Sequence, residues 1–260
     1  MHKIFFPRFI IIPIIAFMCL SPTAVAKPIS VLFIGNSFTK MNNFSEMVVN
    51  IAEENGDTVY ADFAAIDSYT LEKHYGDKNT LDKINSYCWD YVVLQEQSQR
   101  PVMDSAIFYG KTLKYADALA TVIYNNNEET QILLFETWAR KYGDSELCSR
   151  FKWTCTFEDM QNMLIYRYEL LGNAMALPVV PCGKAWFYFA PNSSEHIDLY
   201  YPDNKHPNEV GSYLNACIFY TYLTNHSPIG TSYNPAFLTS EELLKIQEVA
   251  YKVVLRNVEK

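Results

Sequence analysis

The fold is decided by residues 29–39, ISVLFIGNSFT, in which an unbroken apolar run leads directly to Gly35, Asn36 and Ser37. A short apolar run that stops at a glycine is typical of a strand buried on both faces of a parallel sheet. Ser37 therefore lies just beyond the carboxyl end of the first strand. In open α/β sheets this edge is where ligands bind.

The rest of the chain alternates between strand-like and helical patterns. Four further apolar runs predict strands at residues 58–64, 91–94, 131–135 and 178–181. Segments with helical periodicity or helix-start signals predict helices at residues 44–55, 105–124, 158–175, 208–223 and 239–258. This order predicts an α/β fold, a three-layer α/β/α sandwich around a mostly parallel five-stranded sheet of the flavodoxin-like type. Residues 142–157 and 190–201 are expected to be irregular loops, the first near the same edge as Ser37.

A second motif near the other end of the chain complements the serine. Asp203 and His206 are three residues apart in a turn, and Pro207 follows before a helix. A serine nucleophile needs a base to take its proton, and the base needs a carboxylate to orient it. Alone, Ser37 would be interpreted as a helix-capping serine. Together, the two motifs favour Ser37 as nucleophile, His206 as general base and Asp203 as the orienting acid.

Other residues compete for the same roles. Asp198 is the alternative acid if the turn is built differently. His196 is a nearby alternative base, and His74 and His226 are the other histidines beyond the N-terminal segment. His206 is preferred because an acid precedes it by three residues and a helix begins directly after it.

The two motifs together resemble the SGNH, or GDSL-like, hydrolases. The first block of that family is a strand followed by Gly-Asp/Asn-Ser, as in residues 35–37, and its last block is Asp-x-x-His, as in residues 203–206. The blocks bracket most of the chain, so the resemblance covers it nearly end to end. It implies ester hydrolysis through an acyl-serine intermediate.

The sequence departs from that family at the expected oxyanion hole. Members usually have a glycine in a second block and Gly-x-Asn in a third. Here Ser68 stands near the place of the glycine, and Gln95 and Gln97 follow the third strand. We expect the backbone of Ser37 and of Ser68 to donate, together with the side-chain amide of either Gln95 or Gln97. The choice between the glutamines stays open, as does the possibility of an inactive relative.

Two residues after the fourth predicted strand are candidate substrate contacts. Trp138 could stack on a sugar, or it could pack beneath the rim of the sheet, and the two interpretations have equal weight. Arg140 could pair with a substrate carboxylate. An ion pair of Arg140 with Glu136 or Asp144 is the favoured interpretation.

Residues 1–26 have the pattern of a secretory signal peptide, with a basic start, an apolar run and Ala24-Val25-Ala26 before the expected cleavage site. An uncleaved anchor is disfavoured because the run is short and broken by charge and proline. A lipoprotein signal at Cys19 is disfavoured because bulky residues precede it. We therefore expect an exported protein, periplasmic or extracellular, with residues 27–260 as a single SGNH-like hydrolase domain.

Cleavage would leave five cysteines and lower the net charge from −8 to −10, because the segment carries two basic residues and no acid. Cys148 and Cys155 are the most plausible disulfide pair in an exported protein, and Cys217 is interpreted as buried. No cysteine or histidine spacing resembles a zinc site, so neither metal nor cofactor is expected.

The functional prediction is a secreted serine esterase that removes acyl groups, chiefly acetyl, from a carbohydrate. The acidic charge disfavours nucleic acid and anionic membranes, and no membrane insertion is expected after cleavage. The supply of 39 aromatic residues (19 Tyr, 16 Phe and 4 Trp) suits stacking on sugars. Alternatives are a lipase or lysophospholipase of the same family and a non-catalytic glycan-binding protein.

Overall fold

The computed structural model describes residues 27–258, and its centre is a five-stranded sheet. The strands lie in the order β2-β1-β3-β4-β5, and every neighbouring pair is parallel. Their bounds are β1 (Ile29–Gly35), β2 (Val59–Ala65), β3 (Tyr91–Leu94), β4 (Gln131–Phe135) and β5 (Val179–Val180). This is the strand order of flavodoxin-like folds. It confirms the predicted fold class, with a sheet that is wholly parallel.

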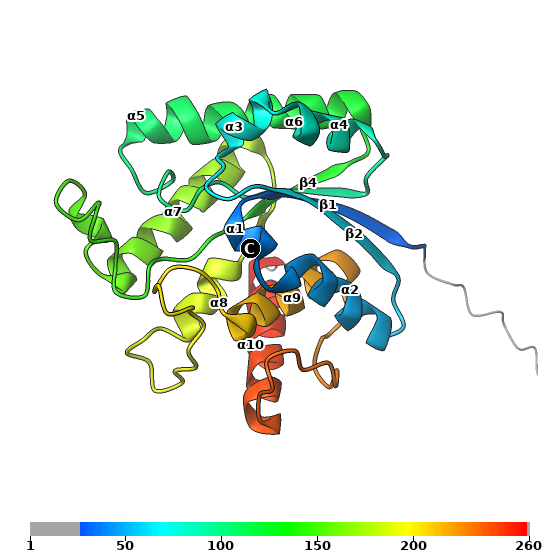
Figure 1. The fold of residues 1–260 in the computed structure, drawn as a ribbon, viewed down its shortest axis with the longest axis vertical. Coiled ribbons are helices and arrows are strands. Elements are labelled where there is room, and N and C mark those ends of the chain that lie inside the picture. The colour runs from blue at the N-terminus through cyan, green and yellow to red at the C-terminus, as the bar shows by residue number, and fades with distance from the viewer. Residues whose placement is uncertain (1–26, 259–260) are drawn as a thin grey trace, which may run out of the picture.

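The helices form a layer on each side of the sheet (Figure 1). One layer contains α3 (Leu71–Gly76), α4 (Lys78–Asn85), α5 (Ser105–Ile107), the π-helical segment η2 (Phe108–Leu113), α6 (Lys114–Asn126) and α7 (Phe157–Met175). The other contains α2 (Phe44–Glu54), α8 (Cys182–Tyr188), α9 (Glu209–Thr224) and α10 (Ser240–Val258). The last helix packs on α8 and α9.

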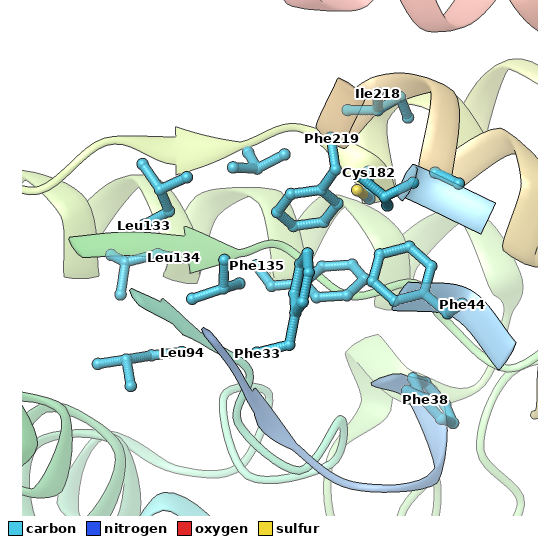
Figure 2. Close-up of a cluster of buried hydrophobic side chains, with 14 of the residues drawn as sticks. Phe33, Phe38, Phe44, Leu94, Leu133, Leu134, Phe135, Cys182, Ile218 and Phe219 are labelled. Carbon is cyan, nitrogen blue, oxygen red and sulfur yellow. The ribbon is translucent and has the colours of Figure 1, made fainter. Parts of the chain in front are cut away.

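The core between the sheet and the second layer is rich in phenylalanine. Phe33 on β1 and Phe135 on β4 meet Phe44 of α2 and Phe219 of α9 (Figure 2). Most of these ring pairs are edge to face, with centroids 4.8 to 5.6 Å apart. Complete burial of one such side chain stabilises the fold by about 1.5–3 kcal/mol. This cluster fixes β1, and therefore the end of β1, against the helix layer that contains α9.

Three short helices were missed by the sequence analysis. α3 and α4 carry too few apolar residues for a clear helical period, but their N-caps were visible: Thr70 accepts from Lys73 N and Asp77 accepts from Thr80 N. α8 begins at Cys182-Gly183, a pair that suggests a loop. Gly183 is required by close packing, since a Cβ there would lie 2.4 Å from the carbonyl oxygen of Thr137.

The predictions for two cysteine sites and for the last helix are confirmed. Cys148 and Cys155 form a disulfide and Cys217 is buried, while Cys88 and Cys182 are free thiols. The final helix begins with a capping box, in which Thr239 and Glu242 exchange hydrogen bonds. No helix within residues 27–258 combines the length and apolar character needed to cross a membrane. The predicted signal peptide lies outside the described residues.

Candidate active site

Ser37 is the first residue of α1 (Ser37–Lys40), a single helical turn that starts where β1 ends. Asn36 caps this turn, accepting from Phe38 N, and its own backbone N–H donates to Gln95 Oε1 at 2.9 Å. Gly35 makes that approach possible, because a Cβ there would lie 2.4 Å from Gln95 Oε1. The backbone around Ser37 is therefore fixed by the neighbouring strand β3.

His206 lies in a turn that its own acid organises. Asp203 Oδ1 accepts from the backbone N–H groups of Lys205 and His206 at 3.1 and 3.0 Å. Asn204, in the left-handed region with φ of 61°, completes the turn. Asn208 then caps α9, accepting from Gly211 N. The order of residues in the motif thus produces a tight turn that ends directly before α9.

The two motifs meet. Ser37 Oγ lies 2.8 Å from His206 Nε2, and His206 Nδ1 lies 2.5 Å from Asp203 Oδ2. Since Nδ1–H donates to the carboxylate, Nε2 accepts from the Ser37 hydroxyl. Partial burial of Asp203 acts to raise its pKa, but hydrogen bonds from His206 and Lys205 outweigh it and lower the pKa below the usual range. The acid therefore stays ionised at neutral pH.

A residue that the sequence analysis did not single out ties the two loops together. Asn42 Nδ2 donates to the carbonyl oxygen of Pro207 at 3.0 Å and to Ser212 Oγ at 2.9 Å. Its φ is 57°, a conformation that asparagine tolerates better than most residues. The only signal in the sequence was the Asn42-Asn43 pair just after the serine, which is typical of such turns.

The structure separates the two glutamines proposed for the oxyanion hole. Gln97 and Ser68 line a cavity of about 520 Å³ that also reaches Asp203. Gln95 is fully buried, and its amide bonds to Asn36 N, to Thr39 Oγ1 and to the carbonyl oxygen of Glu96. The assignment of Gln95 as a donor is therefore wrong, because its amide is inaccessible and supports the Ser37 turn. The Gln97 amide also donates within its loop, to Gln99 Oε1 at 3.0 Å, but it lines the cavity.

Ser68 has the backbone conformation that a glycine would supply. Its φ is 60°, in the left-handed region that glycine favours. Ser68 is exposed, in the loop that follows β2. Ser68, expected near the place of the glycine of the SGNH hydrolases, thus adopts a conformation that glycine favours.

Comparison with solved structures identifies the architecture. A DUF4886 family protein from Bacteroides uniformis superposes with a TM-score of 0.73 at 18% identity, over 88% of this chain and 95% of that one. A candidate SGNH hydrolase from Slackia heliotrinireducens gives 0.57 at 21% identity, over 75% and 98%. The chain has the SGNH hydrolase fold. An acetyl xylan esterase gives 0.56 at 18% identity, over 75% and 100%. No family model matches the sequence, and no curated protein matches it.

Within this SGNH hydrolase fold, Trp138 is not a sugar platform. The side chain is fully buried, and its indole ring stacks between Phe38 at 4.4 Å and Trp186 at 4.1 Å. Its Nε1–H donates to the carbonyl oxygen of Lys205, directly before His206. The substrate-binding assignment is therefore wrong: both ring faces are covered by aromatic rings, and Trp138 supports the histidine turn.

Arg140 lines the cavity at Asp203, but its guanidinium already contacts other side chains of the protein. Its Nε lies 3.4 Å from Asp144 Oδ2, which is the ion pair favoured by the sequence analysis, and Nη1 donates to Ser98 Oγ. Asp198, the alternative acid, pairs with Lys141 at 2.8 Å, whereas Asp203 contacts His206. Among the described residues, no group of three or more His, Cys, Asp and Glu side chains is arranged to hold a metal ion.

Two buried residues hold the backbone around the site by hydrogen bonds, and neither was assigned a role from sequence. His74 Nε2 donates to the carbonyl oxygen of Gly35 at 2.7 Å, and burial lowers the pKa of this histidine, which favours the neutral ring. Glu96 Oε1 accepts from Leu71 N and Gln97 N, joining the loops after β2 and β3. Burial raises the Glu96 pKa to about 7. The available signal in the sequence was an acidic residue between Gln95 and Gln97, directly after an apolar strand.

Proposed function

We propose that this protein is an exported serine esterase that hydrolyses O-acyl groups, chiefly O-acetyl groups, on a carbohydrate. The observation that carries the proposal is the continuous hydrogen-bond chain from Ser37 through His206 to Asp203. The SGNH hydrolase fold supports it, as does the likeness to an acetyl xylan esterase. The Cys148–Cys155 disulfide and the pattern of residues 1–26 support export.

The proposed mechanism follows from the geometry. Ser37 Oγ attacks the acyl carbonyl while His206 Nε2 takes the hydroxyl proton, and Asp203 stabilises the imidazolium. The tetrahedral oxyanion accepts from the N–H groups of Ser37 and Ser68 and from the Gln97 amide. His206 returns the proton to the leaving sugar oxygen. A water molecule, deprotonated by the same histidine, then attacks the acyl-serine, and His206 returns this proton to Ser37 Oγ as the carboxylic acid leaves.

The cavity beside Asp203 favours a small acyl group and a polar alcohol. Charged or amide side chains dominate its lining: Gln97, Gln99, Arg140, Asp144, Glu146, Asp203, Asn204 and Lys205. A long acyl chain would have to desolvate these groups without hydrogen-bonding them. The lining therefore supports the acetyl esterase over the lipase.

Gln97→Ala is expected to lower kcat for ester hydrolysis by about 10²–10³-fold, the usual effect of removing one oxyanion donor. Gln95→Ala is the matched comparison. It leaves the buried Asn36 N–H without an acceptor, so we expect a loss of about 1–3 kcal/mol in the free energy of unfolding. Steady-state kinetics and urea denaturation of both variants measure the two effects. Equal kcat in Gln97→Ala and the parent would contradict the oxyanion assignment.

The experiment that tests the proposal is labelling with a serine-directed fluorophosphonate, read by mass spectrometry, alongside hydrolysis of p-nitrophenyl acetate. We expect a stoichiometric adduct on Ser37 and none after prior denaturation, because the nucleophile needs His206 in place. A folded protein that neither labels nor hydrolyses the ester would refute the esterase and favour the glycan-binding alternative.

A further inference from the structure

A second cavity lies next to the one at Asp203, and the two share Tyr142. The second has a volume of about 660 Å³ and is lined by residues 141–142, 155–159, 187 and 190–193. Tyr142 also lines the cavity at Asp203, and its side chain is 67% exposed. Tyr142 therefore forms a ridge between the cavity at Asp203, the orienting acid of the candidate site, and an unassigned cavity.

The ridge belongs to a loop that is held firmly. The Cys148–Cys155 disulfide closes the later part of the loop, and Asp144 N, two residues after Tyr142, donates to the carbonyl oxygen of Thr154. The Asp144 carboxylate is buried and accepts from Gln99 Nε2 at 2.7 Å and from the backbone N–H groups of Glu146 and Leu147. A preorganised loop of this kind loses little conformational freedom when a ligand binds. The backbone next to the exposed tyrosine is thus held in place.

The lining of the second cavity combines apolar and hydrogen-bonding groups. Phe157 and Phe187 have nearly parallel rings with centroids 6.0 Å apart, and Pro191 adds further apolar surface. Thr156 and Asn192 supply polar groups at the same cavity. A sugar ring needs this combination, because it has an apolar C–H face and a rim of hydroxyl groups, and aromatic faces attract the polarised C–H bonds.

The charges around this cavity select against an acidic ligand. Glu158 and Asp159 line it, and its one basic residue, Lys141, is paired with Asp198 at 2.8 Å. A carboxylated or sulfated sugar would face uncompensated negative charge. An uncharged sugar would not.

We propose that the second cavity binds the sugar next to the acylated one in a neutral oligosaccharide, with Tyr142 stacked between the two positions. The inference rests on the proposed esterase function and specifies its substrate as a chain rather than a single sugar. Sugars bound on both sides of Tyr142 place the ester at the triad, so chain length raises kcat/KM.

The test compares acetylated tetrasaccharides with acetylated monosaccharides of xylose, mannose and glucose. For at least one of these sugars, we expect the parent to have a kcat/KM about tenfold higher on the tetrasaccharide than on the monosaccharide. This factor corresponds to about 1.4 kcal/mol. Tyr142→Ala should bring this ratio close to one, and Tyr142→Phe should preserve it because the ring remains. Tyr166→Ala is the control, since Tyr166 is a similarly exposed tyrosine on α7 that lines neither cavity.

The outcomes separate the two proposals. A parent that hydrolyses p-nitrophenyl acetate and the sugar esters with no chain-length effect overturns the second cavity as a subsite and leaves the esterase intact. If Tyr142→Ala keeps the parent's kcat/KM ratio of tetrasaccharide to monosaccharide, the subsite is likewise overturned and the esterase is left intact. A folded parent that hydrolyses none of the esters overturns the esterase and this inference with it.

Discussion

Ser37→Ala is expected to lower kcat for p-nitrophenyl acetate by about 10⁶-fold, and His206→Ala by a similar factor. The two side chains form one hydrogen-bonded unit, so the double variant should be no slower than either single variant. Asp203→Asn should cost about 10⁴-fold, because an amide favours the wrong imidazole tautomer. Steady-state and single-turnover kinetics on folded protein, verified by circular dichroism, measure these losses.

The chain offers a matched control for the histidine. His226 Nδ1 lies 2.8 Å from Asp57 Oδ2, so it forms the same type of His–Asp pair on an exposed surface. His226→Ala should leave kcat within about twofold of the parent, since surface substitutions rarely perturb a structure. A Ser37→Ala protein that keeps a tenth or more of the parent activity would disprove the nucleophile assignment.

Trp138→Ala is expected to lower the free energy of unfolding by about 3–5 kcal/mol, the usual cost of truncating a buried tryptophan. The substitution removes a ring stacked between Phe38 and Trp186 and leaves a cavity next to the histidine turn. Since a typical domain is stable by only about 5–15 kcal/mol, the variant should be close to unfolding. Urea denaturation followed by circular dichroism measures the change.

Two comparison variants separate packing from positioning at Trp138. Trp138→Phe keeps a stacked ring but loses the donor to the carbonyl oxygen of Lys205, so we expect a smaller stability loss together with a lower kcat. Trp153→Ala removes a partly buried tryptophan in the disulfide loop and should cost less than Trp138→Ala. Equal stability losses for Trp138→Ala and Trp153→Ala would contradict the packing described for Trp138.

The sheet was predictable from sequence because a parallel sheet buries both faces of its strands. Residues 31–34, for example, are apolar in sequence and fully inaccessible in the structure. The short helices at 71–85 were not predictable from periodicity, because α4 buries only Thr80 and Ile84. Capping side chains, not apolar faces, define their starts.

The candidate site was predictable where local spacing determines geometry and not where tertiary packing does. Asp203 and His206 meet within one turn, so their pairing follows from sequence distance. The direction in which the Trp138 side chain points depends on its packing against Phe38 and Trp186, which are distant in sequence. The two glutamines, two residues apart after β3, looked alike until the approach of Asn36 to Gln95 distinguished them.

The contact between Ser37 and His206 joins residues 169 positions apart in the chain. Closing so long a loop is entropically costly, and topologies dominated by such distant contacts fold slowly. The serine and the histidine become partners only after β1 has joined the sheet and the segment that carries α9 has docked against it. The proposed catalytic competence is therefore a property of the finished fold, and recovery of the proposed esterase activity during refolding would report this long-range contact rather than the collapse of the core.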